Sequence, residues 1–320
     1  MQHLRITSPH DLTPAVLDLL RQDPAVTALS YVPDAVLVPE GDLVEADLPR
    51  EAVNEVVDAL REIGVQHEGA IHVIPVATWI SRPAHEAEKQ TPGSSADAVV
   101  WAEVTQRSFD ESELNWTFLT FMTLATMIAS IAIVLDSQIL VIGAMVLGPE
   151  FLPVAALGLA LVRRRPALLR HAAVTLVVGF AVAIVMVTLA ALAARGLGWI
   201  TEDQVTAPRP GTAFIYTPDK WSFIVAVIAA AAGALSLTSA KVGGLSGVFI
   251  SVTTIPAAGN VALGIAFGLP DEIGGSLLQL LVNIAGMAVA GWVALAFQQA
   301  VWSRMSARRA HLVARFRREA

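Results

Sequence analysis

The chain has 320 residues, of which 55% are hydrophobic and only 15% charged, and its mean hydropathy is +0.61. Soluble domains carry about 25% charged residues, so this composition excludes an ordinary soluble protein. Cysteine is absent, which excludes disulfides, thiolate metal sites and cysteine nucleophiles. Residues 1–110 have a net charge of −11 and residues 111–320 one of +4. The sequence therefore predicts an acidic soluble domain followed by a membrane domain.

Residues 1–80 alternate between strand and helix patterns that end at turn or cap residues. Thr13 and Pro14 suit the N-cap and first turn of a helix. Pro33 and Asp34 are typical of a turn, and Gly64 fits a helix C-terminal cap. The expected elements are a strand at 3–7, a helix at 13–22, strands at 26–32 and 35–38, a helix at 53–63 and a strand at 70–76. This β-α-β-β-α-β order predicts an α+β ferredoxin-like domain.

The N-terminal domain shows no sequence signature of catalysis. It has no Gly-rich phosphate loop, and its acidic balance argues against a nucleic-acid partner. His67 and His72 are five residues apart, a poor spacing for metal ligands, so we interpret them as surface or turn residues. We expect a regulatory or oligomerising module. Residues 81–115, which contain Pro83 and a Thr-Pro-Gly-Ser-Ser run, are expected to form a linker with a juxtamembrane helix at 99–114.

The second part of the chain, 116–303, consists of long apolar segments. About 20 apolar residues are needed to cross the hydrocarbon core of a bilayer. Six segments reach about that length: 117–135, 139–162, 168–194, 221–240, 245–269 and 276–302. The sequence therefore predicts an α-helical polytopic membrane domain with six spans, followed by a basic tail at 304–320.

Basic residues lie mainly on one side of these predicted spans. Three arginines lie between the second and third segments and a fourth, Arg170, lies at the start of the third. Lys241 lies between the fourth and fifth segments, and six arginines follow the sixth. The connections at 136–138 and 269–275 carry no basic residue, and the longer one at 195–220 carries three. Cytoplasmic loops are enriched in Lys and Arg, so both termini are expected in the cytoplasm. The first 25 residues contain no apolar stretch of signal-peptide length, which agrees with that orientation.

The second and fifth predicted spans resemble each other. An Ala-Leu-Gly-(Leu/Ile)-Ala block occurs at 156–160 and again at 262–266, an offset of 106 residues. Pro149 and Pro256 interrupt the two spans at an offset of 107 residues. Three spans per unit would give an inverted repeat, the plan of transporters whose broken helices meet near the bilayer midplane. The simpler alternative is that helices rich in alanine and glycine resemble each other by composition.

Glu150 is the only acidic residue well inside a predicted span. A carboxylate there is costly, so we expect it to face a cavity, find a partner or carry a proton. One hypothesis is that it binds a cation or proton; the other is that it caps the second half-helix. The candidate substrate- or ion-binding residues around the two interruptions are Gly148, Pro149, Glu150, Pro153, Thr253, Thr254, Pro256, Asn260, Gln279 and Asn283.

The pattern of these spans is similar to a known family. The Asp-Ser-Gln run at 136–138, Ile-Gly-Ala-Met at 142–145, Gly-Pro at 148–149 and Leu-Gly-Leu-Ala at 157–160, with Ile-Pro-Ala at 255–257, Gly259 and Asn283, carry the resemblance. They resemble the bacterial and archaeal hydrophobic membrane proteins of domain-of-unknown-function family 389. The resemblance implies a cytoplasmic-membrane protein with an extramembrane α/β domain, and no particular substrate. Glu150-Phe151 and Pro256-Ala257 depart from the family's commonest pattern.

Two functions fit these observations. The first is a transporter or channel for a small solute or ion, regulated by the N-terminal domain. The second is a membrane-anchored sensor or scaffold whose N-terminal domain binds a ligand or partner. Interrupted spans favour the first, because an anchor has no need of them. No nucleophile–base pair, metal cluster or cofactor motif is visible, so we expect neither an enzyme nor a cofactor. The partners expected are the lipid bilayer, the solute or ion, and further copies of the chain.

Overall fold

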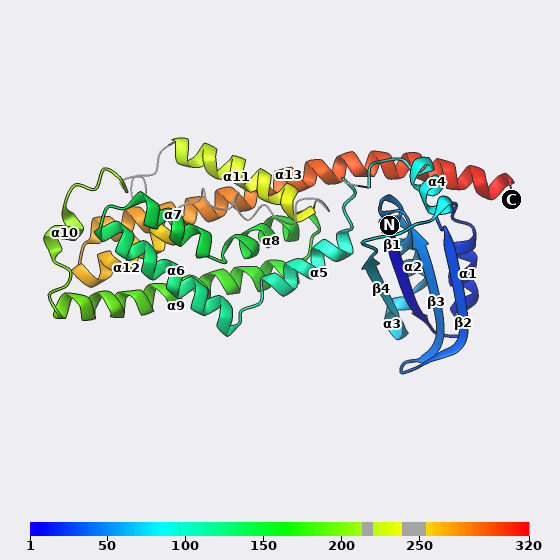
Figure 1. Ribbon diagram of the computed structural model, residues 1–320, viewed down its shortest axis with the longest axis horizontal. Coiled ribbons are helices and arrows are strands. Elements are labelled where there is room, and N and C mark those ends of the chain that lie inside the picture. The colour runs from blue at the N-terminus through cyan, green and yellow to red at the C-terminus, as the bar shows by residue number, and fades with distance from the viewer. Residues whose placement is uncertain (96, 213–219, 239–253, 320) are drawn as a thin grey trace. The chain divides into compact units, whose positions relative to one another are not determined.

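A computed structural model describes residues 1–95, 97–212, 220–238 and 254–319. The chain divides into two compact units (Figure 1). The first is built mainly on Met1–Thr105, and the second mainly on Gln106–Leu237 and Val242–Phe297.

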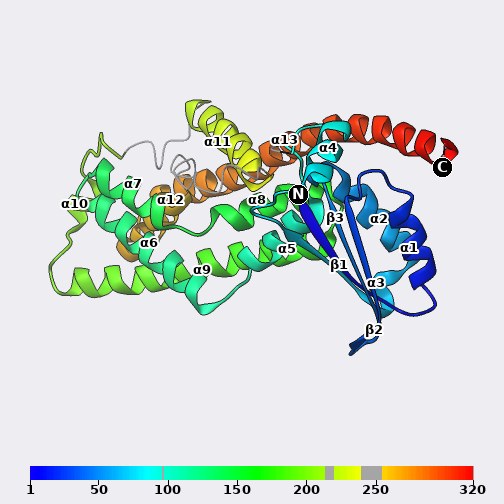
Figure 2. The ribbon, with the colours of Figure 1, turned by 45° about the vertical axis from the view of Figure 1, so that its right-hand side comes forward.

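The first unit contains a four-stranded antiparallel sheet in the order β2-β3-β1-β4. Its strands are β1 (Gln2–Ser8), β2 (Ala28–Leu37), β3 (Glu40–Leu48) and β4 (Ala70–Pro75). Helices α1 (Thr13–Arg21) and α2 (Val53–Ile63) lie on the same face of this sheet, as Figure 2 shows. The central strand β1 pairs with β3 and β4, and the split β-α-β arrangement is the one that the sequence predicts.

In the sheet, alternate residues of β1 and β3 are buried, and in α2 the buried residues lie on one apolar face. Leu4 and Ile6 of β1 are fully buried, as are Val44 and Leu48 of β3. On α2 the predicted apolar face is buried, and the helix ends at Gly64, which has a φ of 96°. Only glycine adopts this left-handed conformation without strain, so the predicted C-terminal cap is confirmed.

The middle of the sheet differs from the prediction. The stretches 26–32 and 35–38 belong mostly to one strand, β2, with a register shift between Val32 and Val36. Asp34, with a φ of 52°, lies inside this irregularity instead of ending the strand. The third strand is instead β3, which sequence reasoning missed because acidic residues alternate with its apolar ones. Thr13 is also not the N-cap of α1; Leu12 holds that position.

Residues 81–115 contain two helices, α4 (Arg82–Gln90) and α5 (Trp101–Glu111), and a short helix α3 (Val65–Glu68) precedes β4. Ser81 caps α4 by accepting a hydrogen bond from the Ala84 amide at 3.3 Å. The stretch before α5 is attached to α2, since Asn54 of α2 donates to the Val99 carbonyl at 2.6 Å. The segment expected as a linker is therefore partly helical and partly attached to the first unit.

The second unit is helical. Its helices are α6 (Trp116–Val134), α7 (Gln138–Leu147), α8 (Phe151–Val162), α9 (Pro166–Gly196), the short α10 (Glu202–Thr206), α11 (Lys220–Thr238), α12 (Thr254–Phe267) and the first part of α13 (Pro270–Glu319). Among the described residues, α6, α9 and residues Pro270–Arg304 of α13 are long and apolar enough to cross a membrane. Helices α7 and α8 form a pair that is bent by 56° at the break between them, and together they would count as a fourth crossing.

These helices match the predicted spans in part. The three long helices and the bent pair coincide with the first, second, third and sixth predicted segments. Helix α11 covers most of 221–240, and α12 covers the second half of 245–269. The first nine residues of that segment lie outside the described residues, so six spans and the inverted repeat stay predictions.

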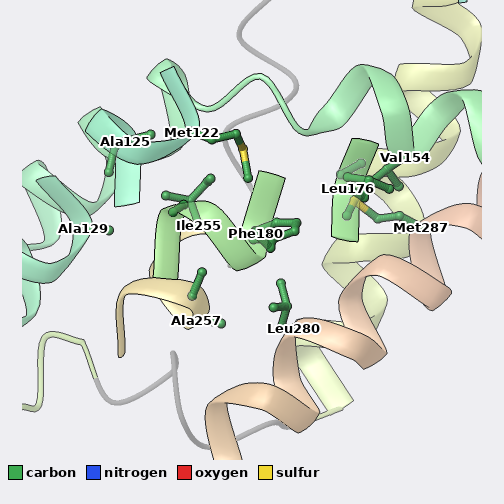
Figure 3. Packing of buried hydrophobic residues seen from close by; sticks show 14 of the residues in the cluster. Met122, Ala125, Ala129, Val154, Leu176, Phe180, Ile255, Ala257, Leu280 and Met287 are labelled. Atoms are coloured by element: carbon green, nitrogen blue, oxygen red, sulfur yellow. The ribbon is translucent and has the colours of Figure 1, made fainter. Parts of the chain in front are cut away.

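Small residues let the helices of the second unit approach closely. A Cβ on Gly158 of α8 would lie 2.9 Å from the Trp292 amide nitrogen of α13, and one on Gly259 of α12 would lie 3.0 Å from the Ser130 hydroxyl of α6. Figure 3 shows the apolar core between these helices, where Met122, Phe180 and Ile255 point toward one another. Glycines and alanines therefore set the packing of this unit.

We expect Gly158→Val to destabilise the second unit by about 1–3 kcal/mol, because its side chain would overlap the α13 backbone. Thermal unfolding of the detergent-purified chain would show this as a lower midpoint. Gly143→Ala in α7 is the matched control, since a Cβ there meets no atom within 4 Å. Equal midpoints for the Gly158→Val variant and the wild type would contradict the close contact.

Candidate functional site

The central feature of the second unit is the break between α7 and α8. Helix α7 ends at Leu147, and its C-cap Gly148 has a φ of −68° and a ψ of 128°. The following Pro149 enforces this extended geometry, because proline disfavours a helical conformation in the residue before it. Glu150 is the N-cap residue of α8, and Pro153 lies in the first turn of α8, where a missing amide hydrogen costs nothing.

The Glu150 side chain is buried at this break, with only 6% of its surface exposed. Its Oε1 accepts a hydrogen bond of 2.7 Å from the hydroxyl of Thr254. Its Oε2 has no hydrogen-bond partner among the described residues. The side chain does not cap α8, which leaves the capping hypothesis without support. A Cβ on Gly148 would overlap Oε2, so only glycine leaves room for the carboxyl group at this place.

Thr254 is the first described residue of α12, and its bond to Glu150 joins this helix to the N-cap residue of α8. Pro256 follows Thr254 by two residues, and Pro153 is the third residue of α8. Thr253, the remaining candidate at this end of α12, lies outside the described residues.

Asn260 takes part in a second buried network. Its amide nitrogen donates to Glu272 at 2.6 Å and to the Ser276 hydroxyl at 2.8 Å, and its oxygen accepts from Arg209 at 3.1 Å. Arg209 also contacts Glu272 at 2.8 Å. Asn260 follows Thr254 by six residues, about 9 Å along the helix. The structure therefore places Asn260 in a separate network from Glu150.

A row of polar side chains on α13 extends from this network into the unit. Glu272, Ser276, Gln279 and Asn283 are spaced by four, three and four residues, which puts them on one helix face. Ser276, Gln279 and Asn283 are each at most 2% exposed. Gln279 donates to Asn283 at 3.4 Å. The two predicted candidates on α13 are thus brought together.

The α12–α13 hairpin sets the level of the row relative to Glu150. Asn260 and Ser276, each eight residues from the joint at Gly268, are 2.8 Å apart. In such a hairpin, residues equally distant from the joint lie at about the same level. Thr254 is fourteen residues from Gly268 and Asn283 is fifteen. The inner end of the row therefore reaches the level of the Thr254–Glu150 bond.

Three connections meet at the other end of the row. Asp136, in the turn between α6 and α7, accepts hydrogen bonds from the Gly211 amide at 3.1 Å and the Thr212 hydroxyl at 2.9 Å. The same loop carries Arg209, which binds the start of α13. The turns at 136–138 and 269–275 and the loop at 195–220 are the three connections that the sequence places on one side of the membrane, and here they touch.

Sequence reasoning missed Arg209. It was counted only as one basic residue of a long loop, yet its side chain is 4% exposed. The signal that could have found it is the Pro-Arg-Pro run at 208–210, because two flanking prolines restrict the backbone on both sides.

A second missed cluster lies in the first unit, where His10, Asp34 and Asp42 are close enough to hold a metal ion. His10 Nδ1 is 3.1 Å from Asp42, and the Asp34 amide donates to the same Asp42 oxygen at 2.9 Å. Burial alone would raise the pKa of Asp42, but hydrogen bonds from Asp34, Thr13 and His10 lower it. These contacts form a satisfied ion-pair network around Asp42, so they do not call for a metal.

The fold combines helices long and apolar enough to cross a membrane with a separate α+β unit. Residues 145–289 match the family described as domain of unknown function (DUF389). This match confirms the resemblance seen in the sequence. The matched segment contains Glu150, Thr254 and the row on α13. No curated protein and no solved structure matches the chain.

We expect Arg209→Gln to lower the stability of the second unit, because it leaves Glu272 and Asn260 without their cationic partner. Glu272 is 22% exposed, so the loss should be smaller than the ~3–5 kcal/mol of a fully buried pair. A double-mutant cycle with Glu272→Gln would show a coupling of about 1–3 kcal/mol in thermal unfolding.

The pair Arg107–Glu111 in the same unit serves as the control cycle, since Arg107 is 54% exposed. Its coupling should stay below about 1 kcal/mol. Similar coupling energies for the two pairs would show that Arg209 does not hold this end of the unit together.

Proposed function

We propose that the second unit is a membrane domain that transports or conducts a small solute or ion, with its binding site at the Glu150–Thr254 contact. The single observation that carries this proposal is a buried carboxyl group with one unpartnered oxygen, at a helix break inside an apolar helical bundle. Such intramembrane acids are costly and mark ion or substrate pathways.

Exposed apolar surfaces support a membrane location. On α9, Val177, Val185 and Leu189 are each more than half exposed, and on α13 Leu281 and Phe297 are as well. Water would disfavour such continuous apolar faces. The polar side chains of Asn260, Gln279 and Asn283 are buried instead. Apolar side chains outside and polar side chains inside suit lipid as the surrounding solvent. The faces rich in small residues are available for packing against a second copy of the chain.

The proposed topology has six spans in a bacterial or archaeal cytoplasmic membrane. Both termini lie on the cytoplasmic side in this topology. Helices α7 and α8 have 10 and 12 residues, or about 15 Å and 18 Å. The break therefore falls near the middle of a 30 Å hydrocarbon core. The contact between the three connections around Asp136 and Arg209 supports placing them together on the outer side.

The helix break between α7 and α8 supports the transport function, and the proposed inverted repeat predicts a second interruption before α12. The N-cap residue of α8, Glu150, contacts Thr254 of α12, and each of these two helices carries a proline close to the contact, Pro153 and Pro256. Interrupted helices that meet near the midplane create binding sites from backbone groups and a few side chains. A membrane anchor for a sensor domain needs neither the breaks nor the buried polar row on α13.

Flux measurements in proteoliposomes test the proposal. We expect the purified full-length chain to carry at least one member of a panel of protons, monovalent cations and small anions. Glu150→Gln should change that flux about tenfold or abolish its pH dependence, because it removes the carboxylate and keeps the shape. Glu68→Gln, at an exposed position of the first unit, is the control. Equal and background-level fluxes for folded wild type and variants would instead favour the anchored sensor.

A further inference from the structure

The Glu150 carboxylate has no balancing cation among the described side chains. The helices around it carry charged or titratable groups only near their ends: Asp136, Arg195, Arg209, Lys220, Asp271 and Glu272 at one end, and Arg163, Arg164, Arg165, Arg170, His171 and Arg304 at the other. The remaining candidate, Lys241, lies outside the described residues. The N-terminal end of α8 supplies partial positive charge, and the C-terminal end of α7 opposes it. The ionised carboxylate therefore needs a positive ligand.

The ligand must also fit a tightly packed place. Oε2 lies against Gly148, and a Cβ there would also lie 2.8 Å from Ile255. Two pockets among the described residues of the second unit, about 740 Å³ and 380 Å³, are lined by other residues and not by Glu150. A metal cation such as Ca²⁺ needs six to eight oxygen ligands. The one hydrogen bond of the described carboxyl group comes from the Thr254 hydroxyl, and a proton needs neither a cavity nor a shell of ligands.

We propose that Glu150 is a reversible proton-binding site, and that the proton is the ion that the transport function carries or couples to. Oε1 is already occupied by the Thr254 hydroxyl, so Oε2 takes the proton. The step is one O–H bond formed on protonation and broken on release, and it changes the charge of the site by one. This inference rests on the proposed function and names the ligand of the same site.

The polar row on α13 is the route that we assign to that proton. By the residue count along the α12–α13 hairpin, Asn283 lies at about the level of Glu150. Gln279, which donates to Asn283, and then Ser276 and Glu272 follow toward the loop that carries Arg209. Buried polar side chains in an apolar bundle are costly unless they hold water or each other. The row therefore assigns proton exchange to the side of the membrane where α12 meets α13.

Infrared titration of the full-length chain in detergent tests the proton site independently of transport. We expect a carbonyl band of a protonated carboxyl group that persists at pH values where exposed glutamates are ionised, and that is absent in Glu150→Gln. Glu68→Gln should keep the band. Absence of the band in the wild type, or its removal by sodium or potassium chloride at constant pH, would overturn the proposal.

Thr254→Val gives a second variant that keeps the carboxyl group and the shape of the site. The Thr254 hydroxyl stabilises the ionised carboxylate by donating to it. Its removal should move the titration of the band upward by about one pH unit. An unchanged titration would overturn the assignment of the band to the Glu150–Thr254 contact.

A flux assay separates this inference from the function it rests on. Proton flux in proteoliposomes, followed with an enclosed pH-sensitive dye, should fall about tenfold in Glu150→Gln and stay unchanged in Glu68→Gln. A flux carried by sodium or potassium with no proton movement would overturn the inference and leave the transport function standing. The infrared band without any flux would overturn the transport function and leave the proton site standing.

Discussion

The hydrogen bond from Thr254 to Glu150 joins α12 to the break between α7 and α8 inside an apolar bundle. Ending α7 and beginning α8 in such surroundings exposes backbone groups that need partners. Gly148 gives the room, Pro149 fixes the extended backbone, and the carboxyl group then has one hydroxyl partner. Small residues such as Gly259 then allow α6, α9 and α12 to pack closely around this point.

The Arg209 network closes the opposite end of the polar row. One guanidinium contacts Asn260 on α12 and Glu272 on α13, and its loop binds Asp136 at the turn between α6 and α7. Three chain connections are thus held by charge-assisted bonds at the place where the row begins. In the proposed transport function, a movement that opens the row would have to break or displace these contacts.

Much of the fold could be predicted, because periodic burial and helix-ending residues act locally. The α2 face, the Gly64 cap, the three long helices and the break after Gly148 all follow from residue patterns. The strand β3 could not, because its acidic residues resemble those of a loop and its pairing with β1 joins residues far apart in the sequence. Helix α4 was hidden in a segment whose composition is typical of linkers.

The sequence by itself determined that this chain carries one acidic group deep in an apolar region and that a proline interrupts the helix there. Those properties depend on neighbours along the chain. Only the tertiary structure decided which distant groups meet it: Thr254 reaches Glu150, whereas Asn260 pairs with Arg209 and Glu272. Side-chain partners more than 50 residues apart depend on helix packing and hairpin register, and local patterns do not encode either.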